Sequence, residues 1–428
     1  MITHYSLITS DPTTQAHLAI ITESNEGPLT LSIAGQNVEA TGTQIPARPE
    51  YIYHFRVSGL LPGRLHPWSI PGLGDGLPLK TLPGAMPPGG LCATVVSDIH
   101  VGVSNAMGTP SEIDILAAQN TDFALFAGDH ANSVRRDHTF ENGGWWITLA
   151  ADYLSRLSST FLMPMYFAPG NHDVGNGLWE GTAETDENAE NYFLTFFPNN
   201  ADIEPLGTNY AAPIFGDWMQ LFAVDTHSTT ALTTAAWAPG AHNADVPICF
   251  PIQHSPTMAA DIRFPSDPLL QANMRNAVSR LYIEAENIKI GVVGHVHART
   301  RSKQIGIVET DPGGNDKFEL ADGGFIVAQE GGYIEVGQGF QSNRINAATQ
   351  PWFLDYAARN EKSFQRIDIS QGAFRFRTIR DNGATVFDQT WQRPRSRRVQ
   401  PVLSDGSLST AVNANGWPVY PVAAVPDP

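Results

Sequence analysis

The pattern of apolar and polar positions changes near residue 88. Before it, short runs such as YIYHFRV (51–57) alternate with the period of two that a half-buried strand requires. HLAIITES and LTLSIAG are further strand-like runs with turn residues between them. Residues 1–88 are therefore predicted to form a small all-β domain of the β-sandwich type.

A second pattern follows the Pro/Gly-rich passage LPGAMPPGG (82–90), which has the composition of a linker. Short apolar runs then alternate with helical stretches, as in layered α/β folds. Helices are expected from SEID (111–114), where Ser111 and Asp114 have capping-box spacing, and over the stretches 145–157, 189–197 and 269–286.

From residue 363 the chain again alternates like strands, in FQRIDIS, AFRFRTI and TVFDQTW, and it ends in a proline-rich tail. The predicted domains are residues 1–88 (β-sandwich), 89–362 (catalytic α/β domain) and 363–428 (β-rich extension and tail).

The composition fits this multidomain picture, because 428 residues exceed one ordinary core and 42% of them are hydrophobic. The net charge of −17 disfavours a nonspecific nucleic-acid binder, but it does not fix the potential inside a cleft. The sequence does not decide whether Cys92 and Cys249 pair.

The N-terminal stretch MITHYSLITSDPTT has no basic start and no long apolar run. No signal peptide or membrane-spanning segment is expected anywhere, so we expect no membrane partner. The default expectation is a cytoplasmic protein, with signal-independent export and the oligomeric state left open.

Candidate chemistry gathers at the ends of five apolar runs in the middle domain. These runs end in Asp98 and His100, in Asp129, in Asn171 and His172, in His254, and in His295 and His297. Because ligands collect at the carboxyl ends of strands in layered α/β sheets, these side chains are expected to converge on one edge.

This set of donors predicts a metal centre. Carboxylates, an amide oxygen and imidazoles without a thiolate suit divalent ions such as Mn, Fe or Zn. Two ions that share a bridging carboxylate can activate a water and hold both oxygens of a displacement at phosphorus. A phosphate ester is thus the expected substrate.

The blocks Asp98-x-His100, Gly128-Asp129, Gly170-Asn171-His172-Asp173, His254 and Gly294-His295-x-His297 resemble the signature of calcineurin-like metallophosphoesterases. The resemblance covers roughly residues 90–340 and implies a four-layer α/β/β/α sandwich with two metals. It implies that Asp98, His100 and His297 bind one metal, that Asn171, His254 and His295 bind the other, and that Asp129 bridges.

By the same resemblance, His172 is not a ligand. It would stand over the leaving group as a general acid or as a stabiliser of developing charge. Asp173 is expected to orient the His172 imidazole by a hydrogen bond.

The layout of a small β domain before the phosphoesterase domain is similar to that of purple acid phosphatases. Two departures argue against their tyrosinate-bound iron: Asn132 stands where they carry a tyrosine, and His100 is an extra histidine. In the first domain, GLLPG (59–63) resembles a fibronectin type III turn, with His66 in place of the usual tyrosine.

Substrate contacts are expected from loops at the strand ends. The candidates are Trp179 in the carboxylate-rich loop 174–190, His242 in the long loop 226–247, and His130 beside Asp129, which could contact either substrate or a metal ligand. The acidic loop favours small phosphate esters over polyanionic nucleic acid.

The sequence therefore predicts a dinuclear-metal phosphoesterase that hydrolyses small phosphate monoesters or diesters. Two alternatives stay open: a nuclease, which a basic groove would favour, and a noncatalytic binding scaffold with the same fold.

Overall fold

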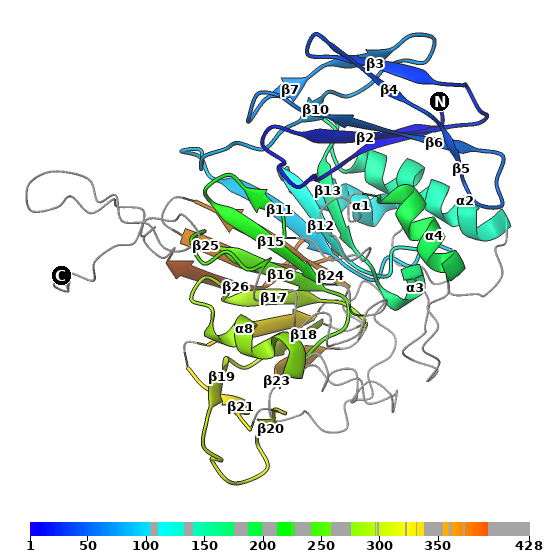
Figure 1. Ribbon diagram of the computed structural model, residues 1–428. Coiled ribbons are helices and arrows are strands. Elements are labelled where there is room, and N and C mark those ends of the chain that lie inside the picture. The colour runs from blue at the N-terminus through cyan, green and yellow to red at the C-terminus, as the bar shows by residue number, and fades with distance from the viewer. Residues whose placement is uncertain are drawn as a thin grey trace, which may run out of the picture.

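Two large sheets carry most of the strands (Figure 1). The computed structural model describes residues 1–102, 110–131, 140–174, 187–198, 212–224, 226, 241–257, 275–295, 297, 299–321, 323–330, 332–337, 354–358, 362–370 and 373–392.

Ten strands form the first sheet. Their order is β26 (Thr385–Gln392), β25 (Ala373–Arg380), β24 (Ser363–Ile369), β11 (Leu91–Val96), β12 (Phe123–Ala127), β13 (Pro164–Ala168), β1 (Thr3–Leu7), β2 (Ala16–Thr22), β6 (Tyr51–Val57) and β5 (Thr43–Gln44). The neighbours β11, β12, β13 and β1 run parallel. β12 is wholly apolar, in FALFA, because both of its faces are covered.

Seven strands form the second sheet. Their order is β14 (Ile214–Phe215), β15 (Met219–Val224), β16 (Cys249–Gln253), β17 (Ile290–Val293), β22 (Ile334–Gly337), β18 (Arg299–Ser302) and β23 (Leu354–Ala358). β15, β16, β17 and β22 are parallel. The small sheet β19 (Ile305–Val308), β21 (Phe325–Ala328) and β20 (Phe318–Glu319) extends beyond it (Figure 1).

Apolar side chains from the facing sides of the two sheets form one core, with Phe123 and Leu125 of β12 packed against Leu221 of β15 and Phe250 of β16. Helical segments cover the outer faces. These are α1 (Pro110–Ala117), α2 (Phe140–Thr148), η1 (Leu149–Tyr153), η2 (Leu154–Arg156) and α4 (Glu187–Phe196) on the first sheet, and η3 (Arg275–Ser279) and α8 (Arg280–Glu284) on the second. The predicted α/β/β/α layering is confirmed.

The predicted helices exist with shifted bounds. α1 begins at Pro110, so Ser111 lies inside the helix, and the Asp114 carboxylate accepts hydrogen bonds from Arg156. The stretch 145–157 is the end of α2 followed by one π and one 3₁₀ segment. Of the stretch 269–286, residues 275–286 fall within the described residues, where η3 and α8 lie.

The predicted all-β N-terminal region is confirmed. A four-stranded sheet of β4 (Gln36–Ala40), β3 (Leu29–Ile33), β8 (Trp68–Ile70) and β9 (Gly74–Asp75) packs on β2 and β6, beside the pair β7 (Leu65–His66) and β10 (Leu79–Lys80). In β6, Phe55 and Val57 enter this core, whereas Ile52 joins the core beneath the helices. The strand thus alternates as predicted, although Ile52 on its second face is buried as well.

The first sheet runs across the predicted domain limits. β1 pairs in parallel with β13, and β24 pairs with β11, so strands from all three predicted ranges share one hydrogen-bonded sheet. The division at residues 88 and 362 therefore stays a prediction, and the three ranges are structurally continuous.

Candidate metal centre

The candidate ligands follow the carboxyl ends of five parallel strands, as predicted. Asp98 and His100 follow β11, Asp129 follows β12, and His254 and His295 follow β16 and β17. Asn171 opens the short helix α3 (Asn171–Val174) just after β13. All seven predicted ligands, His297 included, are buried.

These side chains form two clusters that share one carboxylate. Potential ligand atoms of Asp98, His100, Asp129 and His297 all lie within 4.8 Å of one another, and so do those of Asp129, His254 and His295. The structure therefore brings six predicted ligands together around Asp129.

Asn171 completes the second cluster. Its Oδ1 lies 3.1 Å from His254 Nε2 and 3.0 Å from His295 Nδ1. In the first cluster, His297 Nε2 is 3.3 Å from Asp98 Oδ1, and His100 Nε2 is 3.5 Å from Asp129 Oδ2.

The contacts of His254 indicate that a cation belongs between these groups. His254 Nδ1 lies 2.9 Å from the carbonyl oxygen of Ala127, which can only accept, so Nδ1 carries the proton. Nε2 of the neutral ring is then an acceptor, yet it lies 3.1 Å from Asp129 Oδ2. Asp129 Oδ2 accepts no hydrogen bond within the described chain. Buried acceptors that face one another require a proton or a metal ion between them.

The pKa values show that a proton occupies this position when no metal does. Burial alone would lower the pKa of His254, but the Asp129 carboxylate outweighs it and raises that pKa to about 9. Burial likewise opposes ionisation of Asp129, yet His254 and His172 hold its pKa well below the usual range. Burial and His172 lower the pKa of His100 to about 3, so its imidazole is neutral, the form that binds metal.

Backbone strain is concentrated on the candidate ligands. Five of the eight non-glycine residues with positive φ in the described chain are Asp98 (57°), His100 (53°), Asp129 (56°), His295 (70°) and His297 (52°). The left-handed region costs an L-residue of order 1–3 kcal/mol, and such strain persists where surrounding structure enforces it, often at functional sites.

Two glycines make room for the ligands. A Cβ on Gly170 would lie 2.2 Å from Asp129 Oδ1, and one on Gly128 would lie 2.3 Å from His254 Nδ1. Gly128 also has a φ of +90°. Side chains at either position would therefore push a candidate ligand out of place.

His172 differs from the buried ligands because 28% of its side chain is exposed. Its ring meets that of His100 edge-on at a centroid distance of 4.5 Å, and its Nε2 is 4.0 Å from Asp129 Oδ2. The imidazole thus lies at the open side of the metal centre, where a substrate can reach it.

Asp173 makes contacts other than the predicted one. Its carboxylate accepts hydrogen bonds from the backbone N–H groups of Gly170 (2.8 Å) and His130 (2.9 Å), and it lies 2.7 Å from His130 Nδ1. These contacts tie two loops together, and the orientation of His172 by Asp173 stays a prediction.

Two of the three predicted substrate residues fall elsewhere. The His130 side chain is fully buried, so it has no open path to a substrate. His242 Nε2 lies 2.8 Å from Asn287 Oδ1, near the start of β16 and so at the opposite end of the strand from His254. These placements contradict direct substrate contacts by His130 and His242. Trp179 and Asn132 lie outside the described residues.

Ser97 contributes to the site and was not among the predicted residues. Its hydroxyl donates a hydrogen bond to Asp98 Oδ2, and its oxygen also lies 3.1 Å from the carbonyl oxygen of Ala127, the acceptor that His254 uses. Ser97 therefore links two ligands from different clusters. Its place directly before Asp98 was the available signal.

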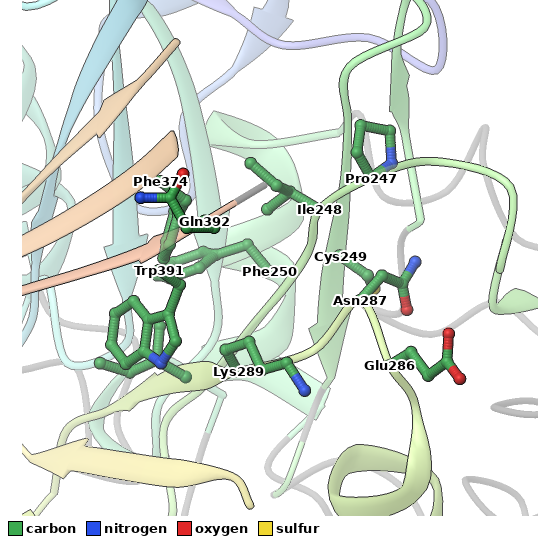
Figure 2. A pocket seen from close by; sticks show the side chains of 11 residues that line it. Pro247, Ile248, Cys249, Phe250, Glu286, Asn287, Lys289, Phe374, Trp391 and Gln392 are labelled. Atoms are coloured by element: carbon green, nitrogen blue, oxygen red, sulfur yellow. The ribbon is translucent and has the colours of Figure 1, made fainter. Parts of the chain in front are cut away.

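A separate small pocket opens at the other end of the strands, between the two sheets (Figure 2). Phe250, Phe374 and Trp391 line it, with Lys289 beside them. Its volume of about 20 Å³ holds roughly one water molecule, so it is too small for a phosphate ester. Cys249 lies beside it, and both cysteines of the chain are free thiols.

Comparison with known proteins identifies the class that this fold and site define. The model of the calcineurin-like phosphoesterase family matches residues 93–299, which span every candidate ligand from Asp98 to His297. Residues 93–299 therefore match the family whose signature the sequence resembles. Its members generally hydrolyse phosphoester bonds and typically use two divalent metals.

Similar solved structures support the fold. The structure of PhoD matches with a TM-score of 0.63 at 11% identity, over 92% of this chain and 90% of PhoD. GAP50, the anchor in the inner membrane complex of Plasmodium, matches with a TM-score of 0.45 at 9% identity, over 72% of this chain and 90% of GAP50. At such identities the first likeness shows a shared fold, and the second carries no argument.

No curated protein matches the chain. Within the residues that the structure describes, no helix combines the length and the apolar character needed to cross a membrane.

Proposed function

We propose that this protein is a dinuclear-metal phosphoesterase that hydrolyses small phosphate monoesters or diesters. The observation that carries the proposal is the shared position of Asp129 in both clusters of ligand atoms. A single carboxylate between two sets of imidazole, carboxylate and amide donors suits a pair of divalent ions such as Mn, Fe or Zn.

In this proposal Asp98, His100 and His297 hold one metal, and Asn171, His254 and His295 hold the other. When bound, the two ions supply charge stabilisation at the phosphoryl group and a water activated at neutral pH. Ala127 keeps the Nδ1 proton on His254, and Ser97 holds Asp98, so the ligands present lone pairs in fixed directions.

His172 acts on the leaving group from the exposed side of the site. Burial lowers the pKa of His172, Asp129 opposes that effect, and His297 lowers the pKa further. The imidazole is thus neutral at neutral pH and can donate a hydrogen bond to developing charge, one of the two roles predicted for it.

The alternatives are less well supported. The full set of ligands on strained backbone favours an enzyme over a scaffold that has lost its chemistry. The net charge of −17 favours small esters over long nucleic acids.

The test is hydrolysis of p-nitrophenyl phosphate beside bis-p-nitrophenyl phosphate, after reconstitution with Mn, Zn or Fe. Faster monoester cleavage would place the protein among phosphatases, and faster diester cleavage among phosphodiesterases. If neither substrate turned over although two metals were bound, the proposed activity on small esters would be wrong.

A further inference from the structure

Two loops of the metal centre are joined by a reciprocal pair of hydrogen bonds. The backbone N–H of His172 donates to Asp129 Oδ1 at 2.8 Å. In the opposite direction, the backbone N–H of His130 donates to Asp173 Oδ1 at 2.9 Å. Asp129, which precedes His130, thus accepts from the loop of His172, and Asp173, which follows His172, accepts from the loop of His130.

The imidazole of His130 adds a side-chain contact between the same two loops. His130 Nδ1 lies 2.7 Å from Asp173 Oδ2, the oxygen that also accepts from the Gly170 N–H. The contact does not have hydrogen-bond geometry, but both side chains are fully buried, and burial strengthens the attraction between an imidazole N–H and a carboxylate.

An aromatic shell surrounds the His130 ring. Phe126 and Phe167 come from β12 and β13, and Phe193 and Phe197 come from α4 and the residue after it. Their ring centroids lie 5.1 to 6.2 Å from that of His130. This shell keeps water and substrate away, so His130 acts through Asp173.

We propose that His130 is a positioning residue: its contact with Asp173 sets the loop that carries Asn171 and His172 against Asp129. This inference rests on the proposed function. It predicts that the two metal positions respond differently to loss of the His130 contact. Asn171 belongs to the second cluster, whereas Asp98, His100 and His297 lie on other loops. Of the first cluster, only the shared Asp129 touches this loop, so loss of the His130 contact weakens the second metal position more than the first.

The test compares His130→Phe, which keeps ring volume but removes the donor, with His130→Asn, whose amide can donate from a similar position. His66→Phe is the control, since His66 is a buried histidine of the N-terminal region. The full chain of each variant is titrated with Mn, and electron paramagnetic resonance separates single ions from coupled pairs.

We expect H130F to bind the first Mn like the wild type and the second about 10- to 100-fold more weakly, the usual cost of losing a group that orients ligands. H130N recovers most of the loss, and H66F shows none. Unchanged affinity for both ions in H130F overturns the proposal. Equal loss of both ions without recovery in H130N also overturns it, because His130 would then be only a packing residue.

A second readout separates this proposal from failure of the proposed function. If the wild type binds fewer than two Mn, the dinuclear function is wrong, and His130 is judged by amide hydrogen exchange of residues 170–174 in metal-free protein. We expect faster exchange there in H130F but not in H130N, and unchanged exchange overturns the proposal. If H130F does not fold, Asp173→Asn is judged by the same two readouts.

Discussion

The two ends of the parallel strands have opposite polar chemistry. At the carboxyl ends, buried acceptors such as His254 Nε2 and Asp129 Oδ2 face each other, on backbone with unfavourable φ. At the other ends, polar groups satisfy one another: Asp122 accepts from Lys80 and from the Cys92 N–H, and Asn287 donates to the carbonyl of Val246.

Within a single strand, one end thus has residues that stabilise the fold, and the other end has residues suited to binding a ligand. Satisfied hydrogen bonds are what stability alone would select. The opposite end keeps strained backbone and a buried cluster of ionisable groups, which is understandable if a ligand binds there. β12 shows both behaviours, with Asp122 before its first residue and Asp129 after its last.

The largest effect is expected from Asp129→Asn, with Asp122→Asn as the matched control on the same strand. Loss of the shared carboxylate should reduce hydrolysis about 1,000-fold or more, because two-metal stabilisation supplies several kcal/mol. D122N should keep activity within about two-fold, because Asp122 is half-buried at the end of β12 away from the candidate ligands. The rates of both variants on the two nitrophenyl esters measure this, and equal rates would remove the proposed division between the strand ends.

His172→Ala should lower kcat by about 100-fold while both metals remain bound, since His172 is not among the proposed ligands. The loss should be larger for esters with poor leaving groups than for p-nitrophenyl esters. Metal analysis and kcat across a series of leaving groups test this. An unchanged kcat would exclude His172 from the chemistry.

Gly128→Ala and Gly72→Ala compare the same backbone strain with and without a ligand nearby. Both glycines have positive φ, +90° and +86°, but a Cβ on Gly72 meets nothing within 4 Å. Each substitution should destabilise the fold by about 1 kcal/mol or more. Only G128A should also weaken Mn binding, because its Cβ displaces His254. Thermal melts and Mn titrations check both parts, and equal Mn affinity in the two variants would speak against His254 as a ligand.

A half-buried histidine far from the centre should change stability without changing metal binding. Burial lowers the pKa of His54 to about 4, although its contact with the Thr195 carbonyl opposes this. Between pH 6.5 and 4 the unfolded chain binds a proton that the folded chain excludes, so the free energy of unfolding falls as pH falls through this window. The loss reaches about 3 kcal/mol.

Urea unfolding at several pH values measures this contribution, with His54→Gln as the control that lacks it. The wild type should lose more stability than H54Q between pH 6.5 and 4. Parallel curves for the two proteins would show that the His54 pKa is not lowered in the folded state.

The positions of the candidate ligands could be predicted from the sequence because they stand just after apolar runs. The end of each apolar run indicates where the strand ends, and a glycine such as Gly128 or Gly294 indicates the turn that follows. Local pattern therefore carries the information for these positions.

The residues whose surroundings differ from the prediction are placed by contacts between segments that are far apart in the chain. His242 lies at the wrong end of its sheet for substrate because the preceding loop returns to Asn287, 45 residues later. His130 turns into the aromatic shell because Phe193 and Phe197 arrive from α4. Likewise, β1 joins the central sheet by pairing with β13 across more than 150 residues. No local period encodes such pairings.

Anomalous X-ray diffraction from Mn-soaked crystals tests the central claim most directly. The account predicts two anomalous peaks on either side of the Asp129 carboxylate, about 3.5–4 Å apart. One peak would be bounded by Asp98, His100 and His297, and the other by Asn171, His254 and His295. A single peak, or peaks away from Asp129, would contradict the dinuclear site.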